Sequence, residues 1–303
     1  MTELTTNFAG IELRNPVLLA SGTCGYGDEL APFLDLSRLG GIVTKTITPE
    51  PRPGNAPPRI VETAAGMLNS IGLQNPGLEG FIRDKWPYLA RLDTRILVNI
   101  AAPTAALHGE MAARLEHVEG IAGIEVNISS PNMKDGGMLF GCSPTASHEV
   151  IAAVRAATQR PVIAKLTPNV TDITSIARAV VDGGADGIAM INTLLGMAVD
   201  WRERRPILGN VTGGLSGPAI KPVALALLWK VRRAVEVPIM GLGGIATAAD
   251  ALEFLVTGAS AVQVGTATFI EPGGAADIVA GIESQCLEAG IERVEELVGT
   301  LRM

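Results

Sequence analysis

The chain has 303 residues, with 24 lysines and arginines against 31 aspartates and glutamates, which gives a formal net charge of −7. Hydrophobic residues make up 47% and charged residues only 18%, which excludes a disordered chain and allows a large buried core. The acidic balance argues against nucleic acid as a partner, because phosphate backbones attract basic surfaces. We find no run of 18 apolar residues and therefore expect no membrane-spanning helix.

Residue types that bind metals or form disulfides are sparse. The three cysteines lie far apart, at Cys24, Cys142 and Cys286. Their spacing predicts no disulfide framework and contains no CxxC motif. The first ten residues lack the basic and apolar regions of a secretory signal. We therefore expect a cytoplasmic protein. The three histidines show no metal-binding spacing, and we expect surface or helix positions and no metal site for His108, His117 and His148.

Short apolar runs alternate along the chain with glycine-rich or polar turns and helical patterns. Eight runs rich in Val, Ile and Leu predict strands that are buried on both faces, as in a parallel sheet. In chain order they are Val17–Ala20, Gly41–Thr44, Ile96–Ile100, Gly123–Ile128, Val162–Leu166, Gly187–Ile191, Pro238–Gly241 and Ala261–Gly265. Amphipathic spacing between the later strands predicts helices over Thr171–Gly183, Lys221–Val235 and Thr247–Gly258.

Eight strand–helix units in about 300 residues predict an α/β fold, a single (β/α)8 TIM barrel, and a doubly wound open sheet is the alternative. In a barrel the active-site groups lie at the carboxyl ends of the strands. These ends carry polar side chains or glycine: Ser21, Gly22, Lys45, Thr46, Asn99, Asn127, Lys165, Asn192, Thr193, Gly243, Gly244, Gly265 and Thr266. The other interpretation of each asparagine or threonine is that it caps a loop.

Glycine, with 35 residues, gathers at the ends of the last two strands and in the segment Gly213–Gly217. Backbone N–H groups without side-chain obstruction predict a ligand with a phosphate tail there. Lys45 and Lys165 are both expected in the barrel mouth, where buried cations need anionic partners. A reduced flavin and a substrate carboxylate are candidates for these anionic partners. The alternative is that each lysine pairs with a carboxylate of the protein, and Glu125 is the one carboxylate within the predicted strands.

Longer motifs match a known family. They are NPVLLASG at 15–22, KT at 45–46, GMLNSIGLQNPG at 66–77, NISSPN at 127–132, KLTPN at 165–169, INT at 191–193, TGGLSGPAIKP at 212–222 and GGI at 243–245. On these motifs the chain resembles the catalytic subunit of class 1B dihydroorotate dehydrogenases, from about Ile11 to Arg302. We expect one barrel domain over residues 1–303, with an insertion after strand 2 (about 47–94) and a lid loop after strand 4 (about 129–142).

The resemblance implies a flavoenzyme that oxidises (S)-dihydroorotate to orotate in de novo pyrimidine biosynthesis. It implies FMN in this chain, and a partner subunit with FAD and an iron–sulfur cluster that passes electrons to NAD. A homodimer joined to two partner subunits, a heterotetramer, is the implied assembly. Residues implied to hold FMN are Ser21, Lys45, Thr46, Asn99, Asn127, Lys165, Ile191, Gly217, Gly243, Gly244, Gly265 and Thr266. Residues implied to hold the substrate are Lys45, Asn69, Ser70, Ile71, Gly72, Leu73, Asn127, Asn192 and Thr193.

The same resemblance assigns the catalytic base to Ser130, which would remove the C5 proton while the C6 hydride goes to N5 of FMN. Class 1 members usually have cysteine at this position, so the serine is a departure. A serine hydroxyl is a much weaker acid than a thiol and needs a proton relay. The alternatives are a related FMN barrel that uses another dihydropyrimidine or another acceptor, such as fumarate or a quinone, and a non-catalytic scaffold barrel.

Overall fold

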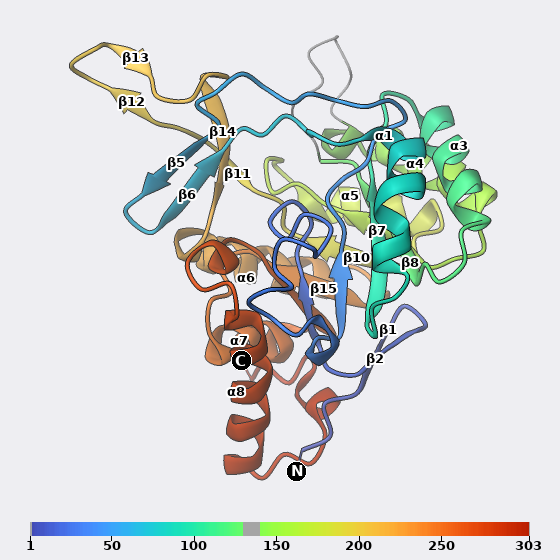
Figure 1. Ribbon diagram of the computed structural model, residues 1–303. Helices are drawn as coiled ribbons and strands as arrows, with labels where there is room; N and C mark the ends of the chain where they lie inside the picture. The colour runs from blue at the N-terminus through green and yellow to red at the C-terminus, as the bar shows by residue number, and fades with distance from the viewer. Residues whose placement is uncertain (1, 130–139, 303) are drawn as a thin grey trace.

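A closed barrel of eight parallel strands forms the centre of the computed structural model, which describes residues 2–129 and 140–302 (Figure 1). The strands are β3 (Val17–Leu19), β4 (Gly41–Val43), β7 (Arg95–Ile100), β8 (Gly123–Asn127), β9 (Val162–Lys165), β10 (Gly187–Met190), β15 (Ile239–Leu242) and β16 (Ala261–Val264). Each overlaps one of the eight strands expected from the sequence. The (β/α)8 barrel is therefore confirmed, and the open sheet is excluded because β16 pairs with β3 and closes the barrel.

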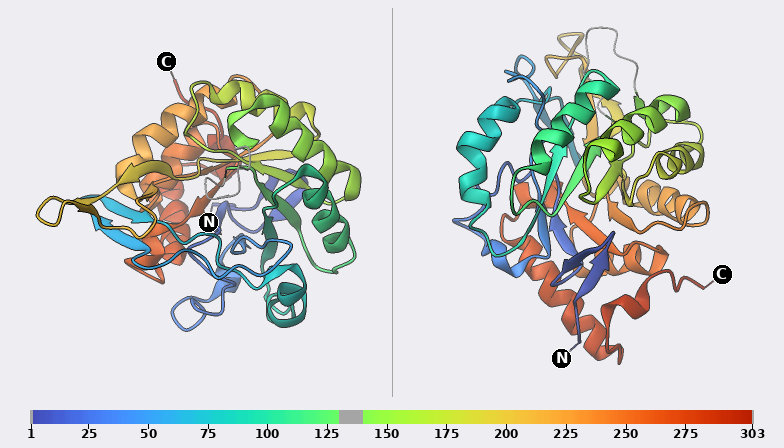
Figure 2. Two further views of the ribbon diagram at one scale, coloured as in Figure 1. Left: turned by 90° about the horizontal axis from the view of Figure 1, so that it is seen from above. Right: turned by 90° about the vertical axis from the view of Figure 1, so that its right-hand side faces the viewer.

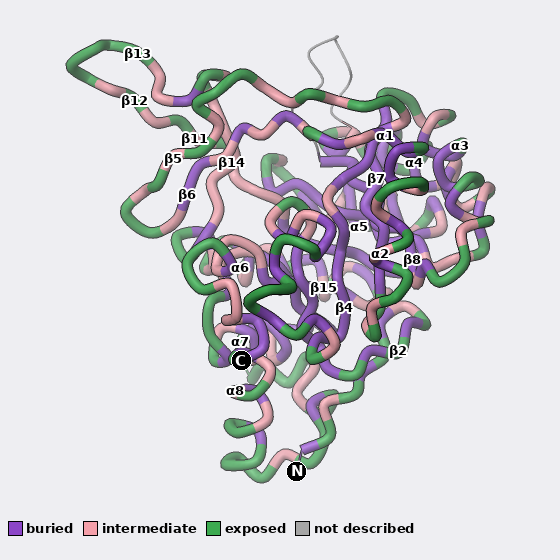
Figure 3. The backbone as a smooth tube through the Cα atoms, in the orientation of Figure 1, coloured by how far each residue is buried: buried purple, intermediate pink, exposed green. Residues whose placement is uncertain are grey.

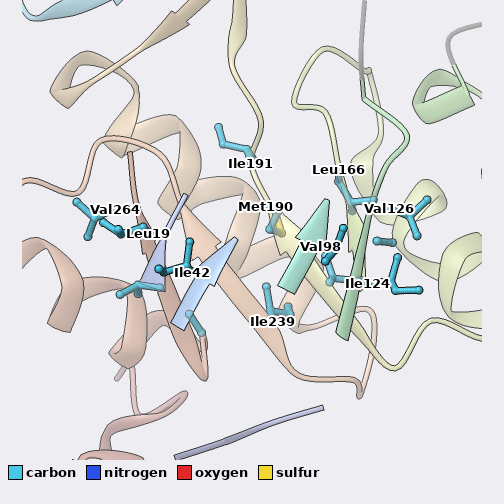
Figure 4. Close-up of a cluster of buried hydrophobic side chains, with 14 of the residues drawn as sticks. Leu19, Ile42, Val98, Ile124, Val126, Leu166, Met190, Ile191, Ile239 and Val264 are labelled. Carbon is cyan, nitrogen blue, oxygen red and sulfur yellow. The ribbon is translucent and has the colours of Figure 1, made fainter. Parts of the chain in front are cut away.

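Side chains on the barrel strands alternate between the helix layer and the barrel interior, as the pleat of a strand requires. Val98, Ile124 and Val126 belong to the larger buried cluster, which lies between the strands and the helices (Figure 4). Leu97 and Ile163, one residue out of phase, belong to a second cluster inside the barrel. Both faces are apolar, which explains why the strands show no alternation in the sequence.

Helices surround the strands, as the view from above shows (Figure 2). They are α1 (Gly77–Gly80) and α2 (Trp86–Leu89), joined by the π-helical turn η2 (Phe81–Lys85), then α3 (Ala105–Glu116), α4 (Pro144–Ala157), α5 (Ile173–Asp182), α6 (Lys221–Arg232), α7 (Ala248–Thr257) and α8 (Gly274–Glu288). The three helices expected from amphipathic spacing are confirmed as α5, α6 and α7. Thr247 caps α7 through its side chain, and Gly258 ends it with φ +125°.

The first strand–helix unit differs from the expectation. Between β3 and β4 the chain forms only a short 3-10 helix, η1 (Leu36–Arg38), so the eight units predicted from the sequence are wrong at this place. Gly22, Gly25 and Gly27 adopt φ values of +91°, +55° and +87° here. Such left-handed residues interrupt a right-handed helix. The other short 3-10 helices are η3 (Phe140–Cys142), η4 (Pro218–Ile220), η5 (Thr266–Phe269) and η6 (Val294–Leu297).

The amino end of the barrel is closed by a hairpin of β1 (Thr6–Phe8) and β2 (Ile11–Leu13). Phe8, Ile11 and Leu13 join the interior cluster, and Phe8 packs against Gly187 at the start of β10. In Figure 1 the hairpin lies below β8. Because this end is plugged by apolar side chains, the open end of the barrel is the one at the carboxyl ends of the strands.

A second sheet covers part of that open end. It is antiparallel, in the order β11 (Leu194–Met197), β14 (Thr212–Ser216), β6 (Gly66–Asn69) and β5 (Ile60–Thr63). A further hairpin of β12 (Val199–Asp200) and β13 (Arg205–Pro206) projects from it, and its turn is exposed (Figure 3). The insertion expected at about 47–94 contains β5, β6, α1, η2 and α2. The expected lid at about 129–142 lies mostly outside the described residues and stays a prediction.

Candidate active site

A pocket of 410 Å³ opens at the carboxyl ends of the barrel strands, beneath the sheet that holds β6 and β14. It brings together most residues that the sequence singled out. These are Ser21, Lys45, Thr46, Asn69, Ile71, Gly72, Leu73, Asn127, Lys165, Ile191, Asn192, Thr193, Gly217, Gly243, Gly244, Gly265 and Thr266. Asn99 and Ser70 are buried beside the pocket and do not line it. Ser130 lies outside the described residues, so its assignment as base stays a prediction.

The floor of the pocket is a buried polar network inside the barrel. Glu125, fully buried on β8, accepts hydrogen bonds from Asn99 Nδ2 at 2.5 Å and from Gln263 Nε2 at 2.6 Å. Lys165 Nζ lies 3.2 Å from the same carboxylate, so the protein-carboxylate alternative holds for this lysine. Gln263 lines the pocket, and its Oε1 has no hydrogen-bond partner among the described residues. That oxygen is a buried acceptor available to an N–H group of a ligand.

Lys45, unlike Lys165, lies in the wall of the pocket. It follows β4, its backbone N–H donates to Gly25 O, and its side chain is half-buried in the pocket wall. Within residues 2–129 and 140–302, no carboxylate lies in ion-pair distance of its ammonium. Burial lowers the pKa of Lys45 below its ordinary value. Lys45 is therefore the lysine of the two that can offer a charge to an anionic ligand.

Two asparagines implied to hold the substrate are linked through a serine that the sequence reasoning did not single out. Ser129 Oγ donates to Asn127 Oδ1 at 2.7 Å and accepts from Asn192 Nδ2 at 2.6 Å. The Ser129 backbone N–H also donates to Asn127 Oδ1. This chain of bonds fixes the orientations of both amides, at the ends of β8 and β10, across the intervening strand β9. A hint was present in the motif, because Ser129 stands between Asn127 and Ser130.

The segment Asn69–Leu73 is shaped by amides on either side of it. Asn55 Nδ2 donates to both the carbonyl and the hydroxyl of Ser70, which explains why Ser70 points away from the pocket. On the other side Asn75, 7% exposed, donates to Leu73 O at 2.7 Å and to Thr48 Oγ1 at 2.8 Å. Its Oδ1 accepts from the backbone N–H groups of Thr48 and Gly77. Asn75 lies in the 66–77 motif, but its residue type alone does not reveal this role.

Glycines form a backbone cradle where β14, β15 and β16 end. Gly217 has φ +95° and Gly244 φ +82°, and a Cβ on Gly244 would lie 2.9 Å from Gly217 O. Thr266 Oγ1 lies 2.8 Å from Ser216 Oγ, which places two hydroxyls at the same edge. The nearby Lys221 is paired with two carboxylates, those of Asp250 and Glu253. The cradle therefore consists of backbone N–H groups and hydroxyls, the groups that bind phosphate at loop–helix junctions.

Two residues outside the site are placed as follows. Cys24 is fully buried, its thiol donates to Ala20 O and Val43 O, and burial raises its pKa to about 12, as suits a packing residue. His108 lies in α3, as a helix residue, but it is buried rather than at the surface. Its Nε2 accepts from Ala102 N–H and its Nδ1 contacts Thr104 O, and burial lowers its pKa to about 4.

Metal-holding clusters and membrane-spanning helices are both absent from the described ranges, residues 2–129 and 140–302. No group of three or more His, Cys, Asp or Glu side chains there is arranged to hold a metal ion. None of the helices in these ranges combines the length and the apolarity needed to cross a membrane.

The fold and the pocket together define a (β/α)8 barrel with a ligand site at the carboxyl ends of its strands. Residues 3–286 match the family model of dihydroorotate dehydrogenase. The chain is 55% identical to the dihydroorotate dehydrogenase B (NAD(+)) catalytic subunit of Pelobacter propionicus over 99% of its length and 98% of that protein. It is also 55% identical to the subunit of the same name from Desulforudis audaxviator, over 96% and 95% of the two chains. The chain belongs to the dihydroorotate dehydrogenase family, which confirms the resemblance seen in its motifs.

Proposed function

We propose that this chain oxidises (S)-dihydroorotate to orotate with FMN bound in the pocket at the carboxyl end of the barrel. The observation that carries this proposal is one pocket that unites the two most specific motifs, 66–77 and 212–222, with the polar strand ends. Family membership and relatives that carry the name dihydroorotate dehydrogenase B (NAD(+)) catalytic subunit support the same reaction.

The residues of the pocket fit FMN. The cradle of Gly217, Gly243, Gly244 and Gly265 would bind the phosphate through backbone N–H groups. Gln263 Oε1, which has no partner among the described residues, suits the N–H of a flavin pyrimidine ring, and the Lys165 ammonium suits its carbonyl edge. The remaining assigned residues, Ser21, Thr46, Asn99, Asn127, Ile191 and Thr266, line or support the same space. When bound, FMN would supply hydride acceptance.

The substrate would be held by other residues of the same pocket. Lys45 carries the charge for its carboxylate, because this lysine has no acidic partner among the described residues. Asn127 and Asn192, fixed through Ser129, offer amide groups that can both donate to and accept from a pyrimidine imide. The segment Asn69–Leu73 closes the same space. Ser130 follows Ser129 directly, and we assign it the removal of the C5 proton.

The electron acceptor and the assembly complete the proposal. We infer that electrons leave for NAD through a partner subunit with FAD and an iron–sulfur cluster, because the relatives are named NAD(+)-type catalytic subunits. We also propose a homodimer joined to two such subunits in the cytoplasm. The single-domain plan, with its insertion at about 47–94 and lid at about 129–142, belongs to this proposal.

The test begins with the absorbance spectrum of the purified chain, reconstituted with FMN where needed. We expect a yellow flavoprotein whose absorbance is bleached by dihydroorotate without oxygen. Reoxidation by NAD in the presence of the partner subunit, compared with fumarate and quinone, identifies the acceptor. A chain that takes up no FMN would favour the scaffold interpretation, and bleaching only by another dihydropyrimidine would overturn the substrate. A Ser130→Ala variant that is bleached at the wild-type rate would refute the assigned base.

A further inference from the structure

Glu125 is the one Asp or Glu side chain that is buried among the residues the structure describes. Its carboxylate meets three donors: Asn99 Nδ2, Lys165 Nζ and Gln263 Nε2. The Gln263 nitrogen also lies 3.1 Å from Met240 Sδ, another acceptor, which fixes the amide with its nitrogen toward Glu125. An ionised carboxylate only accepts hydrogen bonds, so this set of partners is the one an ionised Glu125 requires.

The network crosses the barrel. β8, which carries Glu125, and β16, which carries Gln263, are four strands apart in the closed order of eight and so face each other. Asn99 on β7 and Lys165 on β9 flank Glu125 on both sides. The position of the Lys165 ammonium is therefore set by a carboxylate that is also held from two other strands, β7 and β16. Glu125 does not line the pocket, whereas Lys165 does.

The two lysines of the pocket, Lys165 and Lys45, therefore differ in how their charges are compensated. Glu125 and Lys165 form a buried pair with no net charge, and Lys45 keeps an uncompensated charge within the described part of the chain. Removing one partner of such a pair leaves a buried charge without compensation, while replacing both partners is often tolerated. The two lysines of the pocket are thus electrostatically unequal.

We propose that Glu125 is a positioning residue that holds Lys165 at the floor of the pocket and cancels its charge there, so that the affinity for reduced FMN stays moderate. This inference rests on the proposed binding of FMN. Reduction adds electrons to the flavin, and a buried cation nearby stabilises them strongly because the interior has a low dielectric constant. Glu125 offsets that stabilisation and leaves Lys45 as the principal charge for the ligand carboxylate.

The test is the FMN midpoint potential and the dissociation constant of oxidised FMN in Glu125→Gln. We expect the affinity for reduced FMN, relative to oxidised FMN, to rise at least tenfold. For a two-electron couple, a tenfold rise corresponds to an increase of about 30 mV in the midpoint potential. The matched control is Glu116→Gln. Glu116 ends α3 at the amino side of the barrel, where it accepts from Gln159 N–H, so the same loss of charge should leave the potential unchanged.

A second pair of variants keeps the test sharp where Glu125→Gln fails to fold. Lys165→Met alone should lower the relative affinity for reduced FMN at least tenfold. The double variant, Glu125→Gln with Lys165→Met, removes a neutral pair. Its affinity for reduced FMN, relative to oxidised FMN, should stay within threefold of the wild-type value. An unmoved potential in Glu125→Gln, or a double variant that matches Lys165→Met alone, overturns the inference. Absence of FMN from the wild-type chain would instead overturn the proposed function.

Discussion

The amide of Asn75 offers a direct test of how the segment Asn69–Leu73, which we propose binds the substrate and call the substrate segment, is held. Its side chain makes four hydrogen bonds, to Thr48 N–H, Thr48 Oγ1, Leu73 O and Gly77 N–H. Each is worth about 1 kcal/mol net, so Asn75→Ala should lower the free energy of unfolding by about 4 kcal/mol. Leu73 has φ +56°, a strained conformation that the Asn75 bond to its carbonyl helps to hold.

Asn15 is the matched control. It is 3% exposed and makes three comparable bonds, to Arg38 O, Val17 N–H and Gly40 N–H, at the amino end of the barrel. Asn15→Ala should therefore cost about 3 kcal/mol of stability. Because it lies at the plugged end, away from the pocket, it should leave the binding of substrate unchanged.

The assays are urea unfolding and steady-state kinetics with dihydroorotate. Asn75→Ala should raise KM at least tenfold, since a loss of 1.4 kcal/mol in binding is a factor of ten, with FMN content unchanged. Asn15→Ala should show the stability loss without the change in KM. An unchanged KM in Asn75→Ala, or a similar rise of KM in both variants, would refute the idea that Asn75 positions the substrate segment.

Three further results are expected. Burial lowers the pKa of His108 from 6.5 to about 4, so the stability that the neutral side chain contributes is complete above pH 6.5. The free energy of unfolding should fall by about 3 kcal/mol as the pH drops to 4. Urea unfolding of His108→Gln should not show this loss. Lys45→Met should raise KM about tenfold to hundredfold, and wild-type affinity should decrease as pH rises through the lowered pKa of Lys45, as measured by orotate titration. Gly217→Ala should weaken FMN binding in fluorescence titrations, because its Cβ would lie 2.6 Å from Gly66 Cα; unchanged affinity would contradict the cradle.

Much of the fold could be predicted because its signals are local. The eight apolar runs, the Thr247 cap and the Gly258 stop mark strands and helices within a few residues. The exception was the segment after β3, where left-handed glycines replaced a helix with η1. A count of strand–helix units does not register that local backbone conformation.

For the site, sequence alone named the strand ends, because all parallel strands of a barrel end on one face. It could not decide which lysine is neutralised, because Glu125, Lys165 and Gln263 meet only when the barrel closes and β8 faces β16 across 138 residues of sequence. Nor could it show that Asn99 turns to Glu125 and Ser70 to Asn55, leaving both outside the pocket lining. Residue types and spacing fix what chemistry is available, whereas barrel closure and the register of neighbouring strands determine which groups are already satisfied and which remain for a ligand.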